Sequence, residues 1–168
     1  MRSSTQIQKK IYNKHDLIKQ IFIWKMLGKK IVFTNGVFDI IHKGHISSLT
    51  EAAGYGDVLI VGVNADESVK KLKGLNRPIN DETARALILA SILQTDAVVV
   101  FEEDTPLELI KELMPDVLVK GGDYTIEQIA GAKEVIAGGG VVKIAAIIEG
   151  LSSTNIIEKI KNEHSAKN

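Results

Sequence analysis

Residues 34–45 read TNGVFDIIHKGH and place two histidines three positions apart. The preceding residues 30–34 favour a short buried strand, and residues 44–53 favour a helix. A helix start presents unpaired backbone N–H groups and the positive end of the helix dipole, so anions bind there readily. Because His42 and His45 stand at positions i and i+3, their rings are expected to point the same way. The stretch therefore predicts a phosphate site.

Apolar β-branched runs alternate with helical patterns from residue 30 onward, which is typical of a parallel sheet covered by helices on both faces. No repeat and no Pro/Gly-rich linker divides the chain, so we expect one α/β domain over residues 13–168. Its fold is predicted to be a Rossmann-like, doubly wound parallel sheet of about five strands. Residues 1–12 are polar and aperiodic and are predicted to form a mobile tail. We place strands near 30–34, 57–63, 96–101, 116–120 and 141–146, and helices near 14–27, 44–54, 81–92, 106–113, 126–137 and 153–162.

The composition is that of an ordinary globular protein, and it restricts the chemistry. The 168 residues include 21 basic and 21 acidic side chains, so no net positive field attracts nucleic acid. The chain has no cysteine, which excludes a disulfide framework, a thiolate nucleophile and a zinc–thiolate site. Any anion must therefore be bound by locally placed cations.

The most apolar early run, residues 21–27, is interrupted by Lys25 and is too short to span a bilayer. It also lacks the features of a signal peptide, so we expect a cytoplasmic protein with no membrane partner. The first predicted helix carries more apolar side chains than a surface helix needs. They either pack on the chain's own sheet or form a dimer contact. These side chains are Leu17, Ile18, Ile21, Phe22, Trp24 and Met26.

The H-x-G-H pattern at residues 42–45 resembles the signature of a nucleotidyltransferase superfamily. This superfamily includes cytidylyltransferases, adenylyltransferases and, more distantly, class I aminoacyl-tRNA synthetases. Together with four further blocks in the same order, the pattern resembles the adenylyltransferase domain of ADP-heptose synthase over roughly residues 28 to 161. One short motif alone would be weak evidence, whereas five ordered blocks are specific. The further blocks are KGLNRPIN at 73–80, FEEDTP at 101–106, KGGDY at 120–124 and GLSSTNII at 150–157.

The resemblance implies transfer of AMP from ATP to a sugar 1-phosphate, D-glycero-D-manno-heptose 1-phosphate, with release of pyrophosphate. Both reactants are anions, so such chemistry depends on positioning and on positive charge at the transferring group. We expect His42, His45 and Lys43 to be catalytic, with the imidazoles donating hydrogen bonds to the α-phosphate. The alternatives are that one imidazole merely caps or packs on the helix, or that the pair binds zinc, for which further ligands are lacking.

Nucleotide-binding residues are expected in three places. The first is the turn after the first strand together with the helix start: Thr34, Asn35, Gly36, Phe38 and Gly44, beside the two histidines. The second is the basic loop with Lys73 and Arg77, which could instead be a solvated surface. The third is the hydroxyl cluster Ser152, Ser153 and Thr154, which resembles the family's triphosphate-binding motif but could be a plain helix N-cap.

Acceptor-binding residues are expected mainly where buried strands end. The resemblance suggests this role for Lys120, Gly121, Gly122 and Asp123, although a plain turn is the alternative. Weaker candidates are Asn64, Asp66 and Asp39, of which the last could also orient the histidines or approach a metal. Arg85 is expected to anchor this region. The family's strand order places residues 30–34 beside 116–120, so loops 35–45 and 120–124 are predicted to face each other across one crevice.

Three further expectations concern partners and alternatives. Mg²⁺ should accompany ATP, while the sequence shows no metal-ligand set of its own. Family members are often homo-oligomers, possible dimers included, and a separate sugar kinase would act upstream. One alternative function is a cytidylyltransferase for a polyol or amino-alcohol phosphate, although residues 149–152 depart from that family's R-T-x-G-I-S-T block. The other is a non-catalytic nucleotide-sensing module.

Overall fold

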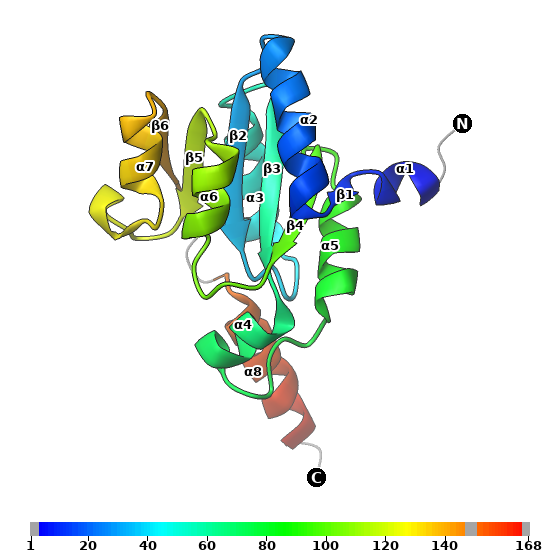
Figure 1. Cartoon of the computed structure of the whole chain (residues 1–168). Helices are drawn as coiled ribbons and strands as arrows, with labels where there is room; N and C mark the ends of the chain where they lie inside the picture. Colours follow the sequence, from blue (N-terminus) through cyan, green and yellow to red (C-terminus); the bar gives the residue numbers. More distant parts are fainter. Residues whose placement is uncertain (1–3, 147–150, 166–168) are drawn as a thin grey trace.

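A six-stranded, all-parallel sheet with helices on both faces forms the molecule (Figure 1). The computed structural model describes residues 4–146 and 151–165, and residues 1–3, 147–150 and 166–168 lie outside this description. The strands run in the order β1-β4-β3-β2-β5-β6. They are β1 Ile11–Tyr12, β2 Ile31–Gly36, β3 Val58–Asn64, β4 Ala97–Phe101, β5 Val117–Gly121 and β6 Val141–Ala145.

This order confirms the predicted doubly wound fold. The first long strand, β2, lies between β3 and β5, with Val32 opposite both Leu59 and Val117. The chain therefore builds outward in one direction through β3 and β4 and in the other through β5 and β6. The helices are α1 Ser4–Gln8, α2 Lys14–Met26, α3 Lys43–Ala53, α4 Asp66–Lys73, α5 Glu82–Ala90, α6 Leu107–Leu113, α7 Ala132–Ala137 and α8 Ser153–Ser165, with a 3₁₀ turn η1 at Ile126–Gln128.

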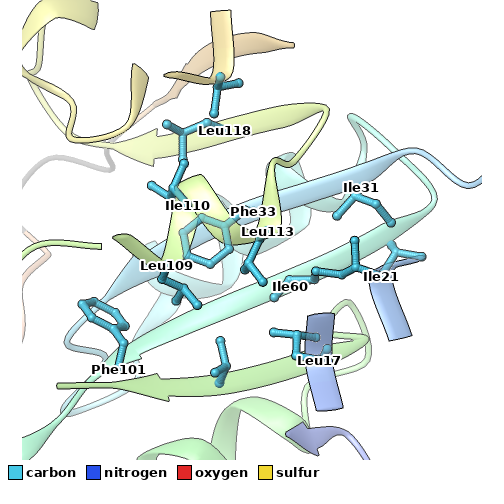
Figure 2. Close-up of a cluster of buried hydrophobic side chains, with 14 of the residues drawn as sticks. Leu17, Ile21, Ile31, Phe33, Ile60, Phe101, Leu109, Ile110, Leu113 and Leu118 are labelled. Atoms are coloured by element: carbon cyan, nitrogen blue, oxygen red, sulfur yellow. The ribbon is translucent and has the colours of Figure 1, made fainter. Parts of the chain in front are cut away.

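Two apolar layers cover the two faces of the sheet. Side chains of α2, α6 and α7 pack with Phe33 and Ile60 on one face, as Figure 2 shows for α2 and α6. Side chains of α3 and α5 pack with Val32 and Val61 on the other. All seven residues of β3 are buried, which explains its continuous apolar sequence. Because the two layers fix the sheet, the loops at the strand ends can carry chemistry without holding the fold together.

The prediction of a mobile tail over residues 1–12 is wrong for the residues that the structure describes. Ser4–Gln8 form α1, and β1 extends the sheet by pairing Ile11 with Val98. The Lys10 ammonium also donates a hydrogen bond to the carbonyl of Thr95 at 2.6 Å. A two-residue strand is too short to show a sequence period. It is a strand only because it pairs with β4.

Two helix predictions also need correction. The single helix expected at 126–137 is divided by Gly131, whose φ of +85° is left-handed. A Cβ there would lie 2.7 Å from the Ile110 side chain, so glycine also allows close packing. The short helix α4 was not predicted, because its charged sequence offers little apolar periodicity.

Helix α2 packs against the sheet of its own chain with only part of its apolar surface. Leu17 and Ile21 are buried against the core, and Ile18 and Trp24 pack partly on it. Phe22 and Met26 remain 65% and 74% exposed. Packing on the sheet therefore accounts for one face of this helix. Among the described residues, no helix is long and apolar enough to cross a membrane.

Candidate active site

The strand order reverses between β2 and β5, and ligands of doubly wound sheets bind beyond the carboxyl ends of strands at such a point. Two cavities open there. Loops 35–45 and 120–124, which were predicted to face each other across one crevice, both contribute to their walls. The first cavity has a volume of about 510 Å³ and extends from the end of β3 across β2 to the end of β5. The second, of about 580 Å³, lies between the start of α3, the loop after β5 and the start of α8.

The two cavities share part of their walls. His45, Lys73, Tyr124 and Ser153 line both of them. Two ligands placed in the two cavities would therefore meet beside one imidazole, one ammonium group and one hydroxyl. This is the geometry that a transfer between two bound anions needs.

The two histidines lie ring against ring at the start of α3. Their ring centroids are 3.8 Å apart at an interplanar angle of 23°, and the Phe38 ring lies 5.3 Å from the His45 ring. His42 occupies the N-cap position of α3, but its side chain makes no capping hydrogen bond. Both Nδ1 atoms are buried without a hydrogen-bond partner among the described residues. The interpretation of either imidazole as a helix cap is therefore wrong.

Burial keeps this histidine pair neutral. It lowers the pKa of His42 below its usual value. The pKa of His45 falls to about 4, because of burial first and then because of the neighbouring His42 and Lys73. Each ring near neutral pH is thus an uncharged donor and acceptor. A bound phosphate would favour the protonated form and counteract this shift.

Glycines and one strained residue position these rings. Phe38 adopts a left-handed φ of +50°, which is rare for an aromatic residue. A Cβ at Gly36 would lie 3.0 Å from the Phe38 ring, and one at Gly44 would lie 3.1 Å from the His42 ring. We expected Gly44 to let the backbone approach a phosphate, and the structure shows that it also makes room for the imidazole.

The predicted hydroxyl cluster lies beside the histidines, although it is more than 100 residues away in the chain. Ser152, Ser153 and Thr154 line the second cavity together with His42 and His45. The Ser152 hydroxyl accepts a hydrogen bond from the backbone N–H of Asn155 at 3.0 Å and so caps α8. The Ser153 hydroxyl donates to the carbonyl of Ile40 at 3.1 Å, which ties α8 to the histidine loop. Gly150, at the start of this motif, lies outside the described residues.

The basic loop contains a lysine without an ion pair among the described residues and an arginine that is paired. Lys73 ends α4 and lines both cavities. Arg77 lines the first cavity, where its Nε donates to Asp39 at 2.8 Å. The Arg77 Nη2 atom is buried without a hydrogen-bond partner among the described residues. Arg77 therefore faces the first cavity and not the one with the hydroxyl cluster.

Asp39 anchors this loop, and its role as an acceptor ligand stays a prediction. Besides Arg77, its carboxylate accepts hydrogen bonds at 2.9 Å from the backbone N–H groups of Ile79 and Asn80. Burial alone would raise the pKa of Asp39, but these bonds outweigh it and hold the pKa below its usual value. Asp39 lines the first cavity, yet the chain itself occupies both of its oxygens.

Asp66 is also part of the scaffold, and its role as an acceptor ligand stays a prediction. It lines neither cavity, and its Oδ1 accepts a 2.6 Å hydrogen bond from the fully buried Arg85. Arg85 further donates to the carbonyls of Val37 at 2.7 Å and Asn80 at 3.0 Å. The predicted anchoring role of Arg85 is therefore confirmed.

The remaining predicted residues divide between the cavities. Asn35, Gly36, Phe38, Asn64 and Lys120 line the first cavity, whereas Gly121, Gly122 and Asp123 line the second. Three of the remaining predicted residues line neither cavity. Thr34 is buried within β2, and Lys43 is exposed on α3. Gly44 lines a smaller third cavity of about 150 Å³ instead.

The cavities also contain lining residues that the sequence did not single out, among them Thr105, Tyr124 and Gln128. The first two stand within the FEEDTP and KGGDY blocks, so the motifs themselves offered a signal. At Gly122, with φ of +136°, a Cβ would lie 2.5 Å from the Tyr124 ring, so this glycine lets the tyrosine fold back over the loop. Nothing in the sequence singled out Gln128.

A metal ion finds no ready-made protein site in the described parts of the chain. Residues 4–146 and 151–165 contain no group of three or more His, Asp or Glu side chains that could hold one. The oxygen ligands that Mg²⁺ prefers would therefore have to come largely from a bound triphosphate and water.

Comparisons with known proteins identify relatives of this chain. The bifunctional protein HldE of Koribacter versatilis (strain Ellin345) is 51% identical over 152 residues, which are 90% of this chain and 31% of that protein. HldE of Haemophilus influenzae (strain PittEE) is 58% identical over 137 residues, or 82% and 29% of the two chains. The chain thus spans about a third of the length of the curated relatives that it matches.

Two solved structures and a family model are also similar to this chain. A lipopolysaccharide core biosynthesis protein from Thermoplasma volcanium GSS1 is 30% identical with a TM-score of 0.59, covering 72% of this chain and 98% of that one. A pantoate-beta-alanine ligase from Francisella tularensis, 19% identical with a TM-score of 0.56, covers 90% and 76% and shares the fold. The model described as cytidylyltransferase-like matches residues 33–159. The chain therefore belongs to the cytidylyltransferase-like family.

Proposed function

We propose that this chain transfers AMP from ATP to a sugar 1-phosphate, D-glycero-D-manno-heptose 1-phosphate, giving ADP-heptose and pyrophosphate. The observation that carries the proposal is the pair of adjacent cavities with a common wall at His45 and Lys73. The choice of heptose is supported by the resemblance of five ordered sequence blocks to the adenylyltransferase domain of ADP-heptose synthase. A similar solved structure, from Thermoplasma volcanium, is named a lipopolysaccharide core biosynthesis protein.

The chemistry follows from the positions of the donors. An oxygen of the acceptor phosphate attacks the α-phosphorus of ATP, and the bond from that phosphorus to the leaving pyrophosphate oxygen breaks. His42 and His45 donate hydrogen bonds to the α-phosphate and bridging oxygen as charge develops there. The N-terminus of α8 and its hydroxyls bind the distal phosphates of the triphosphate. Lys73, at the common wall, neutralises charge on both reactants.

Further partners belong to the same proposal. Mg²⁺ arrives bound to the triphosphate, and no step above depends on a protein-held metal. A sugar kinase activity acts upstream, and the reaction takes place in the cytoplasm. The exposed Phe22 and Met26 of α2 support a homo-oligomer, in the simplest case a dimer.

The test is a screen for pyrophosphate release with ATP or CTP and a panel of sugar, polyol and amino-alcohol phosphates. We expect release with ATP and heptose 1-phosphate. Activity only with CTP and a polyol or amino-alcohol phosphate would replace our choice with the second candidate, which the family's description favours. ATP binding without pyrophosphate from any acceptor would instead indicate a nucleotide-sensing module.

A further inference from the structure

The first cavity contains two carboxylates, and both are already paired. Asp39 is occupied by Arg77 and two backbone N–H groups. Asp104 accepts a 3.0 Å hydrogen bond from the ammonium of Lys71, which does not line the cavity. Both carboxylates of this cavity are therefore paired with cations of the chain, whereas some of the cations that line the cavity have no carboxylate partner.

Lys120 is the clearest case of an unused cation. Its ammonium lies 3.3 Å from the Oδ1 and 3.4 Å from the carbonyl of Asn35, and 5.8 Å from the ring centroid of Tyr124. These neighbours are neutral, and no ion pair of Lys120 is found in the described parts of the chain. Burial accordingly lowers the pKa of Lys120. A withdrawn ammonium group without a counter-ion is unfavourable unless a ligand supplies the charge.

Arg77 adds a second donor to the same cavity. Asp39 fixes its guanidinium through Nε, so the orientation of the group is set before any ligand arrives. The Nη2 atom, buried and without a partner among the described residues, is left for such a ligand. An arginine that is fixed through Nε and keeps a buried donor without a partner is well suited to bind a phosphate oxygen in the cavity that it lines.

We propose that Lys120 and Arg77 bind the phosphate group of the acceptor in the first cavity, while the triphosphate occupies the second cavity. This assignment rests on the proposed function and removes Arg77 from the nucleotide-binding set expected from the sequence. A phosphate monoester carries a charge of about −1.5 to −2 near pH 7, which two cations can match. Its attacking oxygen then lies toward the common wall at His45 and Lys73. The side chains of Asn64 and Thr105 line the same cavity and offer hydrogen bonds to a polyhydroxyl group.

The proposal has a consequence that a structural lysine would not share. Replacing Lys120 by methionine removes a partly buried ammonium group that has no counter-ion and keeps a side chain of similar length. We therefore expect Lys120→Met to melt no lower than the wild type while binding the acceptor poorly. A lysine retained only for packing or hydrogen bonding would give the opposite result.

The kinetic experiment compares wild type, Lys120→Met and Lys133→Met in the pyrophosphate-release assay. Lys133 is an exposed residue of α7 that lines neither cavity, and it serves as the matched control. Lys120→Met should raise the KM for the sugar phosphate by about tenfold or more, the scale of one lost charge-assisted hydrogen bond, and change the KM for ATP less than about twofold. An equal rise in both constants, or a rise for ATP alone, would overturn the assignment.

A binding experiment separates this inference from the proposed function. With the second cavity saturated by α,β-methylene ATP, inorganic phosphate should raise the melting temperature of the wild type and of Lys133→Met but not that of Lys120→Met. Arg77→Lys, which keeps the charge, should show a reduced shift. An equal shift in all four proteins would contradict the site even if the enzyme is active. A wild type that releases no pyrophosphate yet shows the predicted shifts would refute the function and support the site.

Discussion

Two regions of the described structure treat their polar groups in opposite ways. Around the loop of residues 74–85, Asp39 and Arg85 have their charges and hydrogen bonds satisfied within the chain. Around the two cavities, His42, His45 and Lys120 keep donors or charge without a matching partner among the described residues.

This difference in hydrogen bonding distinguishes residues that hold the fold from residues that are available to bind a ligand. A native fold leaves few buried polar groups unsatisfied, so a cluster of them at one place requires an explanation. Among the described residues, His42, His45 and Arg77 have such atoms at the crevice beyond the carboxyl ends of β2 and β5, where two phosphate-bearing ligands are expected, and Thr95 has one before β4. The satisfied region, by contrast, holds the loop that carries Arg77 in place. Substitutions in the first region should therefore reduce stability, and substitutions in the second should reduce activity.

The largest effect is expected for Arg85→Met. The substitution leaves Asp66 without its cation and two carbonyls without their donor, so the free energy of unfolding should fall by about 3–5 kcal/mol. Chemical denaturation measures this change. Asp104→Asn, which alters the exposed pair with Lys71, is the control and should change stability by less than about 1 kcal/mol. Equal losses in the two variants would mean that Arg85 is no anchor.

His45→Ala tests the opposite region. Turnover should fall by about 10²–10³-fold, because one donor to the developing charge is lost, while the melting temperature stays nearly unchanged. Steady-state kinetics and thermal melting measure the two quantities. His15→Ala, at an exposed position of α2, is the matched control and should be silent. If His45→Ala keeps turnover within twofold of the wild type, the residue has no part in the reaction.

Lys73→Ala sharpens the comparison at the common wall. We expect the KM for ATP to rise by about tenfold, in line with a lost charge-assisted hydrogen bond, with little change in unfolding free energy. Kinetics at saturating acceptor measure the rise. A drop in thermal stability of the size seen for a core defect would place Lys73 in the scaffold instead.

A further effect concerns pH. The pKa of His45 is about 4 in the folded protein and about 6.5 when unfolded, so the unfolded state binds more protons between these values. Stability is therefore fully present above about pH 6.5 and declines as the pH falls toward 4. His45→Gln should flatten this decline when unfolding is measured across the window. A slope identical to that of the wild type would show that burial of His45 does not perturb its titration.

Most of the fold was predictable because its signals are local. Continuous β-branched runs such as Val58–Asn64 predict buried parallel strands, and capped helices such as α5, with Asp81 at its N-cap, show their own start. The strand β1 and the helix α4 were missed. Each gains its structure from tertiary partners, and neither has an apolar period of its own.

The site was predictable in its members but less so in their roles. The convergence of Ser152–Thr154 with the histidines follows from the strand order, which the family resemblance supplied. The roles of Asp39 and Asp66 depend on which cation each one meets. That information lies 38 and 19 residues away in the chain, at Arg77 and Arg85, and appears only after folding. Asp39 sits within the most distinctive motif and still belongs to the scaffold.

The most direct measurement is a crystal structure of the protein with α,β-methylene ATP and a sugar 1-phosphate. The account predicts the α-phosphate within hydrogen-bonding distance of His42 and His45 and the distal phosphates at the start of α8. It also predicts the acceptor phosphate against Lys120 and Arg77, on the other side of His45. A triphosphate seated in the first cavity on Lys120, with Ser152–Thr154 making no contact to it, would contradict the account.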